Sequence, residues 1–357
     1  MILQRPRILC AFIPAAVACL LIGATSNAGE NANVPASKFD LSHWKITVPT
    51  DTDANGKVDS INRKQLANYS HPDFFYLDDL GRMVFTAPNK ALTTKNSSNT
   101  RSELRYLRGD IDREISAQAP ANNFSLAAHP SADQFASIGS RMEATLHVDA
   151  VALNAGKPDK FPAYSAVVGQ IHAVKFSGKH ESAGWGNEPL KIYFKKWPGH
   201  EKGSVFWTYE RNLAKADPQR RDIAYPVWGN TWDIATDPGE NGIALGEEFS
   251  YTVNVYQNIM TLTFDTLNQA TVEYEIDLSN NVDAYGNIDA DDNPKGYSGD
   301  SLYFKAGIYD QCSIKDTDGF WYPACAGTGD WAIDQKNGDF ARASFSRLVV
   351  GDAVPSQ

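Results

Sequence analysis

Alternating apolar and polar residues dominate the chain from about residue 39 onward. Apolar and polar residues alternate in the segments SRMEATLHVDAV (140–151), PLKIYFKKW (189–197), SVFWTYE (204–210) and ATVEYEIDL (270–278). A period of two is typical of strands with one buried face. Clusters of Gly, Asn and Asp separate these segments, as turn residues do between antiparallel strands. The pattern therefore predicts many antiparallel strands.

One hairpin and one helix can be placed from the same pattern. Tyr251–Gln257 and Met260–Asp265 alternate on either side of Asn258-Ile259, which predicts a hairpin. INRKQLANY (61–69) is the best helix candidate. No linker, repeat or low-complexity tract divides residues 38–352, so we predict a single domain there. We expect an all-β fold, a β-sandwich or jelly roll, whose sheets often have a concave face.

The first residues are typical of an export signal. Arg5 and Arg7 precede the apolar run ILCAFIPAAVACLLIGA, and SNA ends at Ala28 in the small-x-small form of a cleavage site. We predict a secretory signal peptide over 1–28 and a polar leader over 29–37. The alternative is an uncleaved anchor, because the apolar run is as long as a short membrane span. With cleavage, the protein is expected to be secreted or periplasmic, without membrane contact.

The net charge limits the classes of binding partner, and the cysteine content predicts a disulfide. Residues 1–28 contain two arginines and no acids, so the mature chain has 31 basic and 43 acidic residues and a net charge of −12. That balance argues against a nucleic-acid partner, since phosphate binding needs a basic face. It permits an anionic polymer if the bases gather in one groove. Cys312 and Cys325 are the pair left after cleavage, and an oxidising compartment predicts a disulfide between them.

Three strands carry polar residues on a face where a core strand would be apolar. In RSELR, Arg101, Glu103 and Arg105 share one face. In VVGQIHAV (167–174), Gln170 and His172 share one face, and Val167, Gly169 and Ile171 take the other. In SLYFKAGIYDQCS (301–313), one face has the residues Tyr303, Lys305, Gly307, Tyr309 and Gln311.

Each strand taken singly has a plain structural interpretation. RSELR can be a surface ladder of ion pairs, His172 a structural histidine, and the tyrosines of 301–313 core packing residues. An unpaired buried ammonium is costly, however, so Lys305 between two tyrosines resists the packing interpretation. Three such faces in one chain indicate one site. The sequence offers neither a clear carboxylate pair for glycoside hydrolysis nor a zinc-type ligand cluster.

Arginine, glutamine, histidine and tyrosine together suit β-elimination from a uronic acid polymer. Arginine and an amide can neutralise the C6 carboxylate and stabilise the enolate-like dianion that forms when the C5 proton leaves. A base removes that proton and an acid protonates the departing oxygen at C4. Spacing leaves open whether Tyr303 or Tyr309 transfers the proton.

RSELR, QIH and YFKAGIYDQ, in that order, resemble the signature strands of the alginate lyases of polysaccharide lyase family 7, and FDLSHWKITVP (39–49) is similar to that family's opening segment. The resemblance implies a concanavalin-like jelly-roll β-sandwich with a substrate cleft on its concave sheet. It also implies metal-independent eliminative cleavage of alginate without a cofactor. It implies that Arg101 and Gln170 neutralise the carboxylate, that His172 is the base for guluronate, and that Tyr309 is the acid and also the base for mannuronate. Residues expected in neighbouring subsites are Glu103, Arg105, Tyr303 and Lys305, and Gln311 is expected to meet the sugar.

Substrate preference and metal binding are further expectations. Ile in the middle of QIH is associated in this family with guluronate or mixed specificity, and we expect an endo-acting monomer. The alternatives are a non-catalytic carbohydrate-binding sandwich and a lyase for another polyuronate such as glucuronan. Asp51, Asp53, Asn55 and Asp59 have the spacing of a calcium loop, but Asn62 replaces its bidentate Glu, so no metal is predicted.

Overall fold

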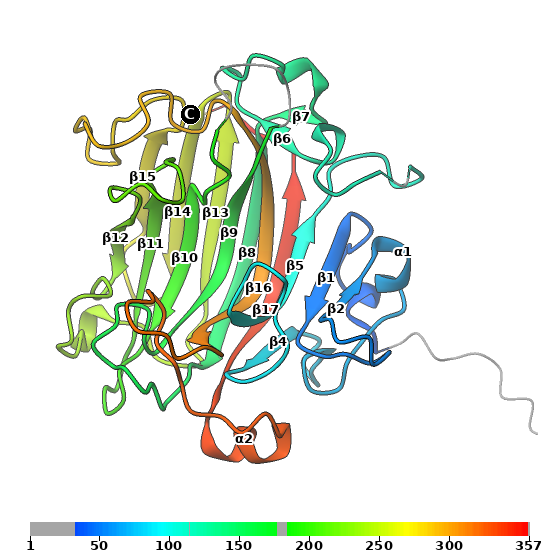
Figure 1. Cartoon of the computed structure of the whole chain (residues 1–357), viewed down its shortest axis with the longest axis vertical. Helices are drawn as coiled ribbons and strands as arrows, with labels where there is room; N and C mark the ends of the chain where they lie inside the picture. The colour runs from blue at the N-terminus through cyan, green and yellow to red at the C-terminus, as the bar shows by residue number, and fades with distance from the viewer. Residues whose placement is uncertain (1–32, 114, 177–183, 356–357) are drawn as a thin grey trace, which may run out of the picture.

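Two antiparallel sheets packed face to face make up almost all of the regular structure (Figure 1). The computed structural model describes residues 33–113, 115–176 and 184–355. The predicted signal peptide, 1–28, and the first part of the leader, 29–32, lie outside the described residues. The predicted all-β jelly-roll sandwich is confirmed.

The larger sheet has ten strands in the order β12-β11-β10-β9-β16-β5-β1-β2, with β6 and β7 attached beside β16. Its strands are β1 Trp44–Val48, β2 Asp59–Ile61, β5 Asn99–Tyr106, β6 Phe124–Ser125, β7 Ser137–Ile138, β9 Ser165–Lys175, β10 Leu190–Lys195, β11 Ser204–Glu210, β12 Asp222–Trp228 and β16 Asp300–Ser313. The three polar-faced strands of the sequence are β5, β9 and β16, and they are direct neighbours in this sheet.

The smaller sheet has seven strands in the order β15-β14-β13-β8-β17-β4-β3. They are β3 Phe75–Leu77, β4 Met83–Pro88, β8 Ser140–Ala150, β13 Phe249–Tyr256, β14 Ile259–Thr266, β15 Val272–Asp277 and β17 Phe340–Gly351. In the part of the chain that the structure describes, the α-helices are the short α1 Arg63–Leu66 and α2 Trp331–Asn337. The single 3₁₀ turns there are η1 Pro35–Ser37, η2 Pro120–Asn122, η3 Ala132–Gln134 and η4 Gly239–Asn241. Among the described residues, no helix has both the length and the apolar character needed to cross a bilayer.

The core fills the space between the two sheets. Phe304, Ala306 and Ile308 of β16 are fully buried in it, as the alternation in SLYFKAGIYDQCS predicts. From the other sheet, the Phe345 ring packs edge-on against Phe85 at 5.3 Å between ring centres. Because these residues use the inner face of β16, the polar residues of the same strand are left on the outer face of the ten-stranded sheet.

The predicted hairpin and helix are both present, with shifted boundaries. β13 and β14 are joined by Gln257-Asn258 instead of Asn258-Ile259, and Gln257 has a φ of 57°, in the left-handed region that such a tight turn requires. The helix within 61–69 is the single turn α1. Asn62 caps it by accepting from the Gln65 backbone, and the Gln65 side chain accepts from the Asn62 backbone.

Strand β9 does not keep a simple alternation, and the prediction that Val167 shares the face of Gly169 and Ile171 is wrong. The register with β10 shifts between Ile192 and Tyr193, and Val167 turns outward. The phenol of Tyr251, from the opposite sheet, donates to the Val168 carbonyl at 3.1 Å. A Cβ on Gly169 would lie 2.5 Å from that phenol oxygen. A glycine is therefore required where the other sheet approaches the β9 backbone.

Candidate active site

Backbone pairing aligns the three polar strands so that their side chains form one surface. Tyr309 lies opposite Arg101 across the β16–β5 pair. Lys305 lies opposite Gln170, and Tyr303 opposite His172, across the β16–β9 pair. Directly opposed residues in antiparallel strands have neighbouring side chains. The order β9-β16-β5 thus brings together groups more than 200 residues apart in sequence.

A cleft of about 750 Å³ crosses the outer face of the ten-stranded sheet. All four predicted catalytic residues line it: Arg101, Gln170, His172 and Tyr309. Other parts of its lining come from the segments 94–99, 185–188, 215–222 and 320–322. A cavity that runs across the strands is suited to an extended chain.

Glu103 is a buried anion that orders the floor beside this cleft. Its side chain is 3% exposed, and it is paired with Lys305 and, at 3.1 Å, with Arg101. The amide of Gln170 donates to its other oxygen. Burial disfavours the charged carboxylate, but Lys305 and Arg101 outweigh burial and hold the pKa of Glu103 below its usual value. The surface-ladder interpretation of RSELR is therefore wrong, because this carboxylate is enclosed and positions two predicted carboxylate-binding groups.

The two tyrosines of β16 have different surroundings. Tyr309 is partly exposed to the cleft, and its hydroxyl lies 3.4 Å from the Ser97 hydroxyl. Its ring packs on an outer aromatic cluster of Val167, Tyr193, Phe206 and Trp232. Tyr303 is 8% exposed and lies outside the cleft lining. Burial raises the pKa of Tyr303 to about 12, although the Arg105 guanidinium lies 3.7 Å from its ring centre.

His172 projects into the cleft beside a glutamate that the sequence gave no reason to select. The imidazole Nε2 lies 2.8 Å from a carboxylate oxygen of Glu188, and Nδ1 lies 2.7 Å from the Ala173 carbonyl oxygen. One face of the ring is stacked on Tyr303, with 5.3 Å between centres and 10° between planes. The ring is fixed on three sides.

An ion network continues the cleft from Glu188 toward β12. Lys191 lies 2.9 Å from Asp222, 3.7 Å from Glu188 and 3.9 Å from Glu210. Arg220 binds Glu210 at 2.6 Å. Sequence reasoning missed these groups, although one signal was present: in PLKIYFKKW, Lys191 and Tyr193 alternate with the core residues Leu190, Ile192 and Phe194. This segment therefore has polar side chains on one face and core residues on the other, as do the three motif strands.

None of the residues predicted to bind substrate is part of the cleft lining, neither Glu103, Arg105, Tyr303 and Lys305 nor Gln311. Arg105 donates to the Asn123 side chain at 3.1 Å and also to the Ala117 carbonyl. Lys305 is 7% exposed, and burial lowers its pKa to about 8 although Glu103 opposes that shift. Gln311 is 1% exposed, and its amide donates to the Tyr309 carbonyl at 3.2 Å. The structure thus holds Gln311 within the fold, where it does not line the cleft.

The loop after β16 supplies an aromatic wall. Cys312 and Cys325 form the predicted disulfide, with 5.4 Å between their Cα atoms. Phe320, Trp321 and Tyr322 lie inside the closed loop and line the cleft. The Trp321 ring also packs edge-on against Trp232, 5.4 Å away, and so joins the outer aromatic cluster.

Comparison with known proteins identifies this arrangement. An alginate lyase family model matches residues 39–352. A curated alginate lyase of Klebsiella pneumoniae is 37% identical over 287 residues, which cover 78% of this chain and 84% of that protein. The chain belongs to the alginate lyases of polysaccharide lyase family 7.

Solved structures agree with this alginate lyase over most of its length. A crystal structure of the alginate lyase from Klebsiella pneumoniae has a TM-score of 0.69 at 32% identity, covering 90% of this chain and 99% of that one. An exolytic family 7 alginate lyase of Zobellia galactanivorans has a TM-score of 0.70 at 30% identity, covering 91% and 100%. Membership makes this protein a polysaccharide lyase and identifies alginate as its substrate, as the three strand motifs predict.

The acidic segment between β1 and β2 lies outside the cleft lining of the lyase. Carboxylate oxygens of Asp51, Asp53 and Asp59 lie within 4.8 Å of one another. Both oxygens of Asp51 accept backbone hydrogen bonds at 2.8 Å, from Asn55 and Gly56. Asp59 accepts from the Thr50 hydroxyl at 2.7 Å. These contacts are those of a tight acidic turn.

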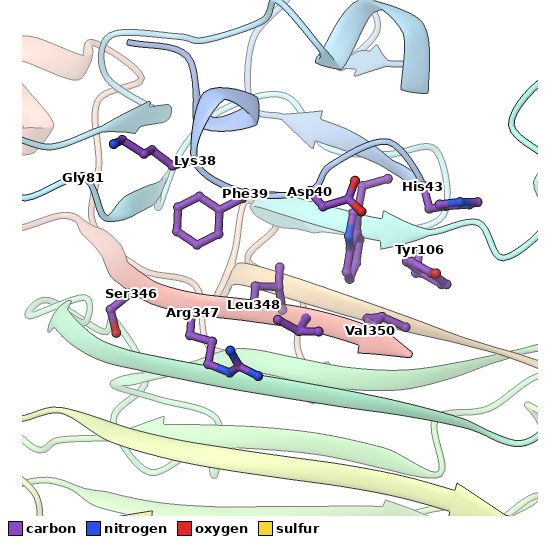
Figure 2. A pocket seen from close by; sticks show the side chains of 12 residues that line it. Lys38, Phe39, Asp40, His43, Gly81, Tyr106, Ser346, Arg347, Leu348 and Val350 are labelled. Carbon is purple, nitrogen blue, oxygen red and sulfur yellow. The ribbon is translucent and has the colours of Figure 1, made fainter. Parts of the chain in front are cut away.

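A second cleft, of about 400 Å³, lies between the N-terminal segment and the end of β17 (Figure 2). Phe39 and Tyr106 face Leu348 and Val350 across it, with Arg347 at its rim. None of the predicted catalytic residues lines this cleft. The larger cleft, which these residues do line, is therefore the candidate active site.

Proposed function

We propose that this alginate lyase is an endo-acting enzyme that cleaves alginate by β-elimination, with guluronate or broad specificity. The observation that carries the proposal is the convergence of Arg101, Gln170, His172 and Tyr309 on one cleft from three neighbouring strands. The family shows an enzyme of this class and so favours it over a carbohydrate-binding sandwich.

In the proposed reaction, Arg101 and Gln170 bind the C6 carboxylate of the uronate whose C5 proton is removed. Glu103 orients both groups by accepting one hydrogen bond from each. Neutralising the carboxylate makes the C5 proton more acidic and stabilises the dianion that follows, which is electrostatic preorganisation. The Nε of Arg101 is buried without a hydrogen-bond partner within the described residues.

The elimination then needs a base at C5 and an acid at the C4 oxygen. For guluronate, His172 takes the C5 proton, the C4–O bond breaks, and Tyr309 protonates the leaving oxygen. For mannuronate, Tyr309 takes the C5 proton and returns it to the leaving oxygen. In both cases a C4=C5 double bond forms at the new non-reducing end. The exposure of Tyr309 to the cleft and the enclosure of Tyr303 favour Tyr309 for this role.

One assay tests the substrate. The mature protein is mixed separately with polyguluronate, polymannuronate, mixed alginate and glucuronan, and the ultraviolet absorbance of the unsaturated product is followed. We expect a rise on polyguluronate and on mixed alginate. A rise on glucuronan only would contradict the substrate, and no rise on any polymer would contradict the lyase proposal.

Endo action is tested by product length. Because the cleft crosses the strands β12 to β5, we expect a chain to lie along it and to be cut internally, so that viscosity falls before short products accumulate. The opposite result, exo action, is the one described for the similar enzyme of Zobellia galactanivorans. Single unsaturated units released from the first time point would establish exo action.

Export and oligomeric state complete the proposal. The segment 1–28 supports secretion or delivery to the periplasm, and N-terminal sequencing of the exported protein should begin at Gly29. We also propose a monomer, to be tested by light scattering. A start at Met1 in the exported protein, or a dimer mass, would contradict these two points.

A further inference from the structure

His172 is held at both ring nitrogens by hydrogen-bond acceptors. Glu188 contacts Nε2 at 2.8 Å and the Ala173 carbonyl contacts Nδ1 at 2.7 Å. A neutral imidazole has one N–H, so it can donate to one of these two acceptors. Only the imidazolium donates to both. The contacts of this histidine are therefore those of a cation, whereas the proposed base for guluronate must present a free lone pair.

Glu188 is itself fixed in place as an anion. Its backbone N–H donates to Glu210 at 3.1 Å, and its carboxylate lies 3.7 Å from the Lys191 ammonium. Burial opposes ionisation, but His172, a hydrogen bond with Glu210 and Lys191 outweigh it and hold the pKa of Glu188 well below its usual range. The ionised carboxylate is thus a hydrogen-bond acceptor for the ring Nε2.

Other charged or titratable groups face His172 less directly. Tyr303 covers one face of the ring, and the Arg105 guanidinium lies behind Tyr303. Lys191 and Glu210 lie behind Glu188. Of these groups, Glu188 is the one whose charge contacts a ring nitrogen. It therefore has the largest influence on which protonation state the ring adopts.

We propose that Glu188 is a positioning residue that holds His172 as the imidazolium between turnovers and thereby sets the pH at which guluronate can be cleaved. This inference rests on the proposed function. Before each guluronate turnover Nε2 gives its proton to solvent and leaves Glu188. It then accepts the C5 proton, while Tyr309 gives its phenol proton to the leaving C4 oxygen. The renewed imidazolium returns to Glu188, and Tyr309 is reprotonated from solvent.

Mannuronate cleavage provides an internal comparison. In that reaction Tyr309 is both base and acid, so the proton on His172 does not have to leave. Glu188 should then affect the pH dependence of polyguluronate cleavage and leave that of polymannuronate unchanged. A purely structural role for Glu188 would change both substrates together.

The test is Glu188→Gln, which keeps the side-chain size and removes the charge. With polyguluronate we expect the acidic limb of the kcat/KM profile to move about one pH unit lower, giving roughly tenfold higher kcat/KM on that limb. The polymannuronate profile should not move. Glu273→Gln, an exposed change on β15 with the same effect on net charge, is the matched control and should leave both profiles as they are.

Two outcomes would overturn the inference. One is an unchanged polyguluronate profile in Glu188→Gln; the other is an equal shift on both polymers. If Glu188→Gln does not fold, nitrogen NMR of the wild-type His172 ring decides: a ring mostly neutral at pH 7 contradicts the proposal. An inactive wild type on every polymer would instead contradict the proposed function, and the NMR measurement would still report on the pair.

Discussion

The guanidinium of Arg101 lies 4.0 Å from the centre of the Tyr309 ring. Both groups also contact the hydroxyl of Ser97, Arg101 at 3.0 Å and Tyr309 at 3.4 Å. The proposed carboxylate-binding group and the proposed proton carrier are thus held as one unit. A uronate bound by Arg101 is thereby placed next to the phenol.

Tyr309→Phe should abolish most turnover while keeping the fold. The phenylalanine ring can still pack on the outer aromatic cluster and under Arg101, so the change removes the proton-carrying hydroxyl. Loss of a general acid–base group lowers kcat roughly 10²- to 10⁴-fold. The measurement is the initial rate of absorbance increase on polyguluronate and polymannuronate. Tyr303→Phe, which keeps the ring stacked on His172, is the matched control. A larger loss there than in Tyr309→Phe would show that the wrong tyrosine was chosen.

Glu103→Ala should destabilise the protein. It leaves Lys305 and Arg101 as buried cations without their shared anion, and removing one member of a buried ion group costs roughly 3–5 kcal/mol of unfolding free energy. Urea unfolding measures the change. Glu143→Ala, which removes a more exposed carboxylate paired with Arg347, should cost no more than about 1 kcal/mol. Equal costs for the two changes would refute the buried-anion interpretation.

Replacing both Cys312 and Cys325 by serine should weaken stability and substrate binding together. The disulfide joins residues 13 apart, and opening a loop of that size costs about 3 kcal/mol in the chain-entropy model. The freed loop contains the aromatic wall of the cleft, so KM should rise more than kcat falls. Thermal unfolding and steady-state kinetics on alginate check both effects. An unchanged KM would mean that the wall does not contact substrate.

Asp310→Asn should remove a pH dependence of stability. Burial raises the pKa of Asp310 to about 8, whereas the unfolded chain loses this proton near pH ~4. Between these values unfolding releases a proton, so the wild type loses stability as pH rises, by at most roughly 1.4 kcal/mol per pH unit. The asparagine Oδ1 can still accept from the Cys312 backbone. Urea unfolding at pH 4, 6 and 8 should show a growing advantage for the variant, and exposed Asp133→Asn should show none.

A chelator should leave turnover intact. The proposed elimination uses Arg101 and Gln170, in place of a metal ion, to neutralise the carboxylate. Rates on polyguluronate before and after incubation with EDTA, followed by gel filtration, test this expectation. If activity falls and calcium restores it, Asp51→Asn should reproduce the loss, and the acidic turn between β1 and β2 would then have to be reassigned as a metal site.

The sequence was informative where a short-range pattern determines the structure. Alternation in β16 correctly separated Phe304, Ala306 and Ile308 from the polar face, and three motifs identified the strands that prove to be neighbours. It failed at Val167, because the irregularity of β9 is associated with a contact from Tyr251, 84 residues away in sequence. Glu188 was missed for a related reason: it precedes β10 outside any alternating run, and its partner His172 is brought to it by sheet pairing.

The contact of Tyr251 with the β9 backbone connects the seven-stranded sheet to a strand that lines the larger cleft. Within the described chain, no residue of the seven-stranded sheet lines the larger cleft. Yet Tyr251 meets β9 at Gly169, between Val167, which supports Tyr309, and Gln170. A change at position 251 is therefore expected to alter the β9 backbone next to both Val167 and Gln170. The proposed reaction centre can thus be approached from the core, through a side chain that does not line the larger cleft.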